Sequence, residues 1–234
     1  MDLLIKGSTE LNKMFAALEK TAAGLRHDFG EVENLQQSLR SARDFVTKAT
    51  TRIEESILND LLLVRPSAGL LTPNMSRDGD GRDEFVLAIS GAANFVRANP
   101  NFAISLALRS NGETKIALIY APILDKLYYA EAASGACMFS VLHSTKIRVS
   151  QIADVAESMI AYNTNDNSKR FGDVRMSGCP ALDLAGVASG KLDAFVSDPL
   201  DFAEIAAGEL IVREAGGKIT MGAELVATNG HIEL

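Results

Sequence analysis

The middle of the chain contains a series of short apolar runs that are separated by tight-turn residues. The runs are FVLAIS, FAISLAL, KIALIYAP and KLYYAEA, and they lie between residues 85 and 132. Asn-Gly and Pro turns stand between several of them. Consecutive strands that are joined by such short turns pair in antiparallel fashion. We therefore predict an antiparallel meander in the middle of the fold.

Two helices are expected before this sheet. Apolar residues recur at helical spacing over residues 8–25. A second helix is expected to begin at Ser41, where Ser41 and Asp44 form a candidate capping box. Its apolar face contains Phe45, Ala49, Ile53, Ile57 and Leu61. Residues 65–84 are rich in Pro and Gly and are predicted to form a loop.

The last third of the chain has a different pattern. Residues 183–196 indicate a helix that ends at a glycine, followed by a strand. Residues 199–220 indicate an amphipathic helix, the pair Gly216-Gly217 and another strand. We predict an α/β fold class in two parts that pack as one compact unit: an α+β part over residues 1–145, with the antiparallel sheet, and an α/β part over residues 146–234.

Composition narrows the class of protein. The chain has 234 residues and a net charge of −7, which argues against a direct nucleic-acid-binding surface. Cys137 and Cys179 give no disulfide framework and suit a reducing compartment. The N-terminus lacks the apolar stretch of a signal peptide, and no apolar run reaches the length that spans a membrane. We expect a cytoplasmic protein without membrane association.

Three segments resemble the inositol monophosphatase family, and its bacterial extragenic-suppressor branch in particular. They are GCPALDLAGVASGKLD over residues 178–193, AEIAAGELIVREAGG over residues 203–217, and LVATNGHI near the end. The similarity covers most of the chain from about Asp44 onward. It implies a layered αβαβα sandwich of the inositol monophosphatase and fructose-1,6-bisphosphatase type. It also implies a homodimer and a phosphatase that uses several Mg²⁺ ions.

The resemblance also places the family's metal-binding motifs on this chain. In LAISGAANF the two metal-binding Asp positions fall on Leu87 and Ser90. The Thr that polarises the attacking water falls on Ala92, and the Asp of the D-x-V-T-x-x-D motif falls on Thr50. Mg²⁺ prefers hard oxygen ligands, mainly carboxylates. These degenerate positions therefore predict that most of the metal site is lost.

The phosphate-binding turn of the family is better kept. Gly91, Ala92 and Ala93 have the backbone pattern of a turn into a helix, where N–H groups can receive an anion. Gly178 and Cys179 match a family motif and are implied to line the same substrate site. We expect this backbone cradle to bind an anion weakly, without catalysis.

Few carboxylates remain at the family's other metal positions. The Glu pair of the family falls on Pro73 and Asn74. Glu204 stands where the last metal-binding Asp is expected, and Asp201 lies close to it in sequence, so both are weak candidates for a metal ligand. For Asp198 or Asp201 a helix-capping role is favoured.

These patterns lead to a functional hypothesis and an alternative. We predict an inositol-monophosphatase-like protein that has lost its Mg²⁺-dependent phosphatase activity and needs no cofactor. It would act by binding a regulatory protein partner or a phosphorylated small molecule. The alternative is an active Mg²⁺-dependent phosphatase for inositol or sugar phosphates, with a metal site rebuilt around Glu204, Asp198 and Asp201.

Overall fold

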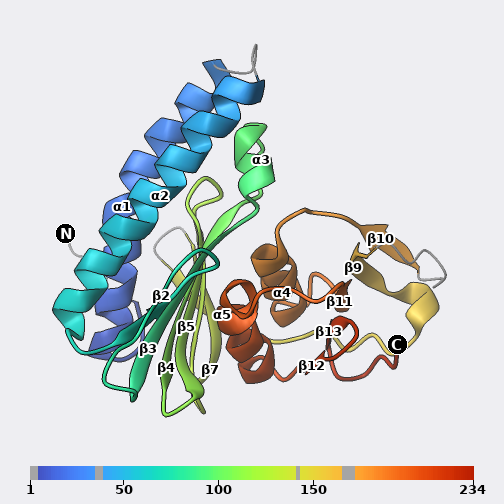
Figure 1. Cartoon of the computed structure of the whole chain (residues 1–234). Helices are drawn as coiled ribbons and strands as arrows, with labels where there is room; N and C mark the ends of the chain where they lie inside the picture. The colour runs from blue at the N-terminus through green and yellow to red at the C-terminus, as the bar shows by residue number, and fades with distance from the viewer. Residues whose placement is uncertain (1–4, 35–38, 141–142, 165–171) are drawn as a thin grey trace.

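The structure is a computed structural model, and it describes all residues except 1–4, 35–38, 141–142 and 165–171 (Figure 1). Its first part is a helical pair on an eight-stranded sheet of order β2-β1-β3-β4-β5-β6-β7-β8. The elements are α1 (Thr9–Asn34), α2 (Leu39–Val64), β1 (Gly69–Leu71), β2 (Ser76–Arg77), β3 (Asp83–Ser90), α3 (Ala92–Val96), β4 (Ala103–Ser110), β5 (Glu113–Ala121), β6 (Lys126–Glu131), β7 (Gly135–Ser140) and β8 (His143–Ile147). From β3 to β8 each strand pairs antiparallel with the next. The predicted meander is confirmed.

The second part is a five-stranded sheet of order β10-β9-β11-β13-β12 with two helices. The elements are η1 (Val155–Glu157), β9 (Met159–Asn163), β10 (Asp173–Arg175), α4 (Pro180–Ala188), β11 (Ala194–Ser197), α5 (Phe202–Glu214), β12 (Lys218–Met221) and β13 (Leu225–Thr228). Here parallel and antiparallel pairs are mixed. The helix and strand alternation predicted for this part is confirmed.

The layers follow from alternation along the first sheet. In β3, Phe85, Leu87 and Ile89 face the core formed with α1 and α2. The residues between them, Val86 and Ala88, face α4 and α5. Figure 1 shows α1 and α2 side by side along one face of the first sheet, with α4 and α5 between the two sheets. The predicted mixed α/β fold is therefore confirmed, with helices and sheets in successive layers.

The glycine in the middle of α5 allows the two central helices to approach closely. A Cβ built on Gly208 would lie 2.4 Å from Cδ1 of Leu184 in α4. Any larger residue at this position would push α4 and α5 apart. This close crossing explains why a helix with a strongly apolar sequence contains a glycine, which otherwise lowers helix stability.

Some predicted boundaries were wrong. Helix α2 begins at Leu39, so Ser41 lies inside the helix and the capping box proposed there is wrong. Leucine and arginine are strong helix formers, and they carry the helix upstream of Ser41. The predicted loop over residues 65–84 contains β1 and β2, and β3 already begins at Asp83. No helix of the described part of the chain is long and apolar enough to cross a membrane.

Candidate functional site

The turn from β3 into α3 depends on a glycine. Gly91 has φ 83°, in the left-handed region that L-residues rarely adopt. A Cβ at this position would lie 2.8 Å from the carbonyl oxygen of Asn101 and 3.0 Å from Cβ of Cys179. Strain and lack of space therefore both select glycine here.

The side chain of Asn94 fixes this turn against two other segments. Its Nδ2 donates to the carbonyl oxygens of Asn101, at 2.7 Å, and Ser177, at 2.8 Å. Gly178, with φ 71°, lies against the same side chain, since a Cβ there would be 3.4 Å from Nδ2. The start of α3 is thus held next to the segment that leads into α4.

Leu87 lies in the apolar core of the first part of the fold. Its exposed fraction is 0%, and it belongs to the cluster formed by the first sheet with α1 and α2. An alkyl side chain offers no oxygen to a hydrated cation. The position of the family's first metal-binding Asp is therefore a packing position in this chain.

Ser90 connects β3 to the start of α4. Its hydroxyl is fully buried and accepts a hydrogen bond from the backbone N–H of Ala181 at 3.2 Å. The Sγ of Cys179 lies 3.6 Å from the same oxygen. An N–H group in the first turn of a helix has no partner within that helix. Ser90, at the end of β3, supplies the missing acceptor and so caps the start of α4.

Neutral residues also stand at the other positions where the family has metal-binding acids, and they make local contacts. Thr50 donates its hydroxyl proton to the carbonyl oxygen of Thr47, one turn earlier in α2, at 3.0 Å. Pro73 and Asn74 form the exposed turn between β1 and β2, which the Thr72 hydroxyl closes by accepting from the N–H of Asn74 at 3.2 Å. None of these residues supplies a carboxylate.

The start of α5 holds the remaining acids of the site. Asp201 caps the helix by accepting from the N–H of Ala203 at 2.8 Å, so the predicted capping role is confirmed. Burial, and secondarily the carboxylate of Asp201, raises the pKa of Glu204. Asp198 lies exposed before this start. Glu204 therefore remains a half-buried acid, with no hydrogen bond or ion pair from its side chain to any described residue.

The start of α4 holds a second acid and a thiol. Burial raises the pKa of Cys179 to about 11, and that of Asp183 to about 6. The Ser177 hydroxyl lies 2.7 Å from Oδ2 of Asp183 and accepts from the N–H of Cys179 at 2.9 Å. The thiol therefore stays protonated near neutral pH, which does not suit a nucleophile.

The donor groups at this site do not suit a cluster of Mg²⁺ ions. Nowhere in the described part of the chain do three or more His, Cys, Asp or Glu side chains gather closely enough to hold a metal ion. At the family's metal positions the chain offers one carboxylate, that of Glu204. The nearby carboxylate of Asp201 is engaged as a helix cap. Mg²⁺ is held by several hard oxygen ligands in octahedral geometry.

A hollow of about 350 Å³ lies between α2 and α3, where Figure 1 shows the short helix beside the first half of α2. We call it the α2–α3 hollow. It is lined by Arg43, Val46, Thr47, Thr50, Ala92, Ala93, Val96 and Arg97. The structure therefore brings the predicted residues Thr50, Ala92 and Ala93 together, whereas Leu87 and Ser90 are buried outside this lining.

Sequence reasoning missed Arg43 as a site residue. A signal was present, because Arg43 precedes Thr50 by seven residues, which is two turns on one face of a helix.

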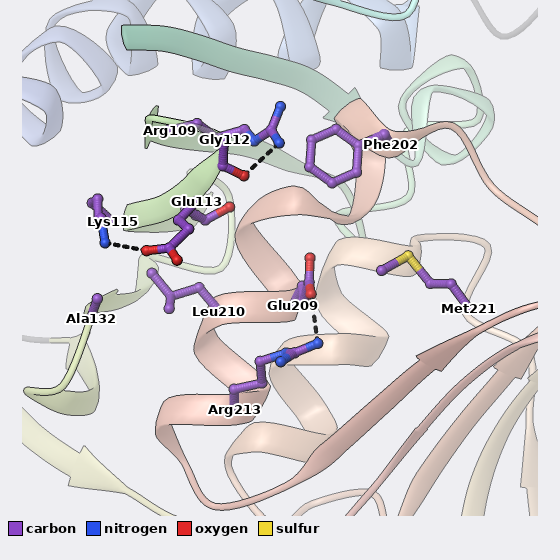
Figure 2. A pocket seen from close by; sticks show the side chains of 11 residues that line it. Arg109, Gly112, Glu113, Lys115, Ala132, Phe202, Glu209, Leu210, Arg213 and Met221 are labelled. Atoms are coloured by element: carbon purple, nitrogen blue, oxygen red, sulfur yellow. Dashed lines mark hydrogen bonds and ion pairs between the residues drawn. The ribbon is translucent and has the colours of Figure 1, made fainter. Parts of the chain in front are cut away.

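A larger hollow, of about 490 Å³, lies between the β4–β5 hairpin and α5, and sequence reasoning missed it (Figure 2). We call it the β4–β5 hollow. Its charged groups are joined in pairs: Lys115 with Glu113 at 2.5 Å, and Arg213 with Glu209 at 2.9 Å. Arg109 binds the carbonyl oxygen of Gly112 at 2.7 Å and Glu84 at 3.0 Å, and lies over the ring of Phe202.

Comparison with known proteins gives consistent matches. The model of the inositol monophosphatase family matches residues 8–225. An inositol-1-monophosphatase of Rhizobium meliloti is 34% identical over 90% of this chain and 84% of the relative. The Nus factor SuhB of Xylella fastidiosa is 30% identical over 89% of this chain and 80% of the relative. The crystal structure of extragenic suppressor protein suhB from Bartonella henselae has a TM-score of 0.85 and 32% identity, and the match covers 96% of this chain and 95% of that one.

Proposed function

The chain belongs to the inositol monophosphatase family, and we propose that it has lost the Mg²⁺-dependent phosphatase activity and acts by binding. The proposal is carried by the two positions at which the family has metal-binding Asp residues, because this chain uses both of them for packing and capping. Leu87 packs in the core between the first sheet and α1 and α2, and Ser90 caps the start of α4. Both side chains are committed to holding the fold, and neither is available to a cation.

Hydrolysis of a phosphate monoester requires charge that the remaining side chains do not gather. The substrate is a dianion, and metal ions both neutralise it and activate the attacking water. Glu204 alone is a poor substitute for a set of carboxylates. We infer that a chain with this donor set holds no Mg²⁺ cofactor and has no appreciable turnover.

The kept shape of the site supports a role in binding. Gly91 and Asn94 preserve the turn into α3, and Gly178 and Cys179 lie beside it. Relatives of this chain carry two kinds of name, inositol-1-monophosphatase and Nus factor SuhB. By similarity to the second group, we propose a regulatory protein partner, and by the kept turn, a phosphorylated small molecule. A homodimer in the cytoplasm is part of the same proposal.

One observation favours the alternative of an active phosphatase. Glu204 is half-buried and unpaired among the described residues, as expected of a carboxylate that awaits a cation. Asp198 and Asp201 lie a few residues away and would supply the remaining charge. The capping bond of Asp201 weighs against this, since a cap that turns toward a metal leaves the N–H of Ala203 without its partner.

The two functions differ in a direct assay. We propose to measure hydrolysis of inositol-1-phosphate and fructose-1,6-bisphosphate over a Mg²⁺ titration, with the Rhizobium meliloti relative as a positive control. The proposal expects no Mg²⁺-dependent phosphate release above the rate without protein. Saturable Mg²⁺-dependent turnover that Glu204→Gln abolishes would establish the alternative instead.

A further inference from the structure

The α2–α3 hollow contains two arginine side chains and no acid. Arg43 comes from α2, and Arg97 follows the last residue of α3. Among the described residues, neither guanidinium has a hydrogen bond or ion pair to a protein group. The net charge of the chain is −7, whereas the charged residues that line this hollow are both positive.

The contrast with the β4–β5 hollow shows why this matters. There, Figure 2 shows Lys115 paired with Glu113 and Arg213 paired with Glu209. Arg109 is paired with Glu84 at 3.0 Å. Charges that are already paired offer little to a ligand. In the α2–α3 hollow the guanidinium groups keep their donors, and the planar fork of arginine matches the oxygens of a phosphate.

We propose that the α2–α3 hollow is a metal-independent site for a small phosphate monoester, bound by Arg43 and Arg97. The two positive charges match the two negative charges of the phosphate group. Both arginines lie outside the family motifs, which supply positive charge through metal ions. The proposal rests on the function proposed above, because it assumes that no metal occupies the neighbouring positions.

The rest of the lining indicates the body of the ligand. Thr47 and Thr50 donate their hydroxyl protons to backbone carbonyls at 3.0 Å, so their oxygens present lone pairs to the hollow. Those lone pairs accept hydrogen bonds from hydroxyl groups of a ligand. Val46 and Val96 supply an apolar wall. A volume of about 350 Å³ suits a small molecule with one phosphate and several hydroxyl groups.

The test is a calorimetric titration of the full chain in EDTA with inositol-1-phosphate, inorganic phosphate and myo-inositol. We expect inositol-1-phosphate to bind most tightly, phosphate more weakly, and myo-inositol not detectably. Arg43→Gln and Arg97→Gln should each weaken binding about tenfold, because each removes charge-assisted hydrogen bonds. Lys48→Gln is the matched control, since Lys48 is an exposed cation on α2 that does not line the hollow. It should leave the affinity within about twofold.

A second variant tests the hollow without removing either arginine. Ala93 is exposed in the first turn of α3, where an acid is compatible with the helix. Ala93→Glu places a carboxylate in the lining and should weaken binding of inositol-1-phosphate at least tenfold.

The outcomes separate this proposal from the proposed function. Binding in EDTA that the arginine variants do not change, or no binding at all with or without Mg²⁺, would overturn the arginine site and leave the loss of metal chemistry standing. Binding that requires Mg²⁺ and survives both arginine variants would overturn both proposals.

Discussion

The start of α3 and the start of α5 contrast in charge. At α3, Ser90, Gly91 and Ala92 form a neutral turn whose shape is fixed by close contacts. At α5, Asp201 and Glu204 remain acidic. The difference teaches that the backbone of this turn keeps its shape without acids at the family's metal positions. Glycine geometry and hydrogen bonds hold it, so its charges can be replaced while its shape remains.

The largest effect is expected from placing an acid in β3, at the position where the family has a metal-binding Asp. Leu87→Asp should lower the free energy of unfolding by at least about 4 kcal/mol, because it removes a buried alkyl group and buries a carboxyl group instead. Urea unfolding measures the change. Leu87→Met is the control and should cost less than about 1.5 kcal/mol. A cost below about 1 kcal/mol for Leu87→Asp would mean that this position faces solvent or a polar site.

Gly91→Ala tests the claim that backbone shape holds the α3 turn. We expect a loss of about 3 kcal/mol, from the left-handed conformation and the contacts with Asn101 and Cys179. The control is Gly112→Ala, since Gly112 has φ 81° but nothing within 4 Å of its built Cβ. That control should lose only about 1–2 kcal/mol in urea unfolding. Equal losses for the two variants would show that close contact at Gly91 does not contribute.

Asp183, at the start of α4, should make the stability of the protein depend on pH. Burial raises its pKa from 3.8 to about 6, so the folded protein binds more protons than the unfolded chain between these values. Its contribution to stability is therefore greatest below pH 3.8 and is lost as the pH rises through about 6. Relative to Asp183→Asn, the wild type should lose roughly 2 kcal/mol between pH 4 and pH 7.

Unfolding by urea at both pH values measures this difference, and Asp198→Asn is the exposed control. A wild-type protein whose pH dependence equals that of Asp183→Asn would contradict the raised pKa.

The smallest effect concerns the acidic start of α5. Asp201→Ala should cost about 1 kcal/mol, the usual contribution of a helix cap. Asp198→Ala, which removes an exposed acid nearby, should stay within about 0.5 kcal/mol. Thermal unfolding with and without Mg²⁺ checks both. Stabilisation by Mg²⁺ that disappears in Asp201→Ala would mean that this acid serves a metal and not only the helix.

Much of the fold could be predicted because its signals are local. The turns between residues 85 and 132 determine how neighbouring strands pair, so the antiparallel order of these strands could be predicted from them. The start of α2 was predicted wrongly at Ser41, since a capping signal competed with strong helix formers upstream.

The site was harder to predict because it depends on contacts between distant segments. Ser90 was identified as a position that had lost a metal ligand, but its bond to Ala181 joins residues 91 positions apart. The α2–α3 hollow likewise requires that residues 43–50 lie beside residues 92–97. The spacing places Arg43 on the helix face of Thr50, but only the packing of α3 against α2 brings Arg43 beside Arg97.

We infer that the chain has kept the shape of the family's site and cannot bind the family's metal. Calorimetric titration of the protein with Mg²⁺, in the presence of inorganic phosphate, tests this most directly. We expect no saturable heat up to millimolar Mg²⁺, for the wild type and for Glu204→Gln alike. Stoichiometric, saturable binding by the wild type that is lost in Glu204→Gln would contradict it.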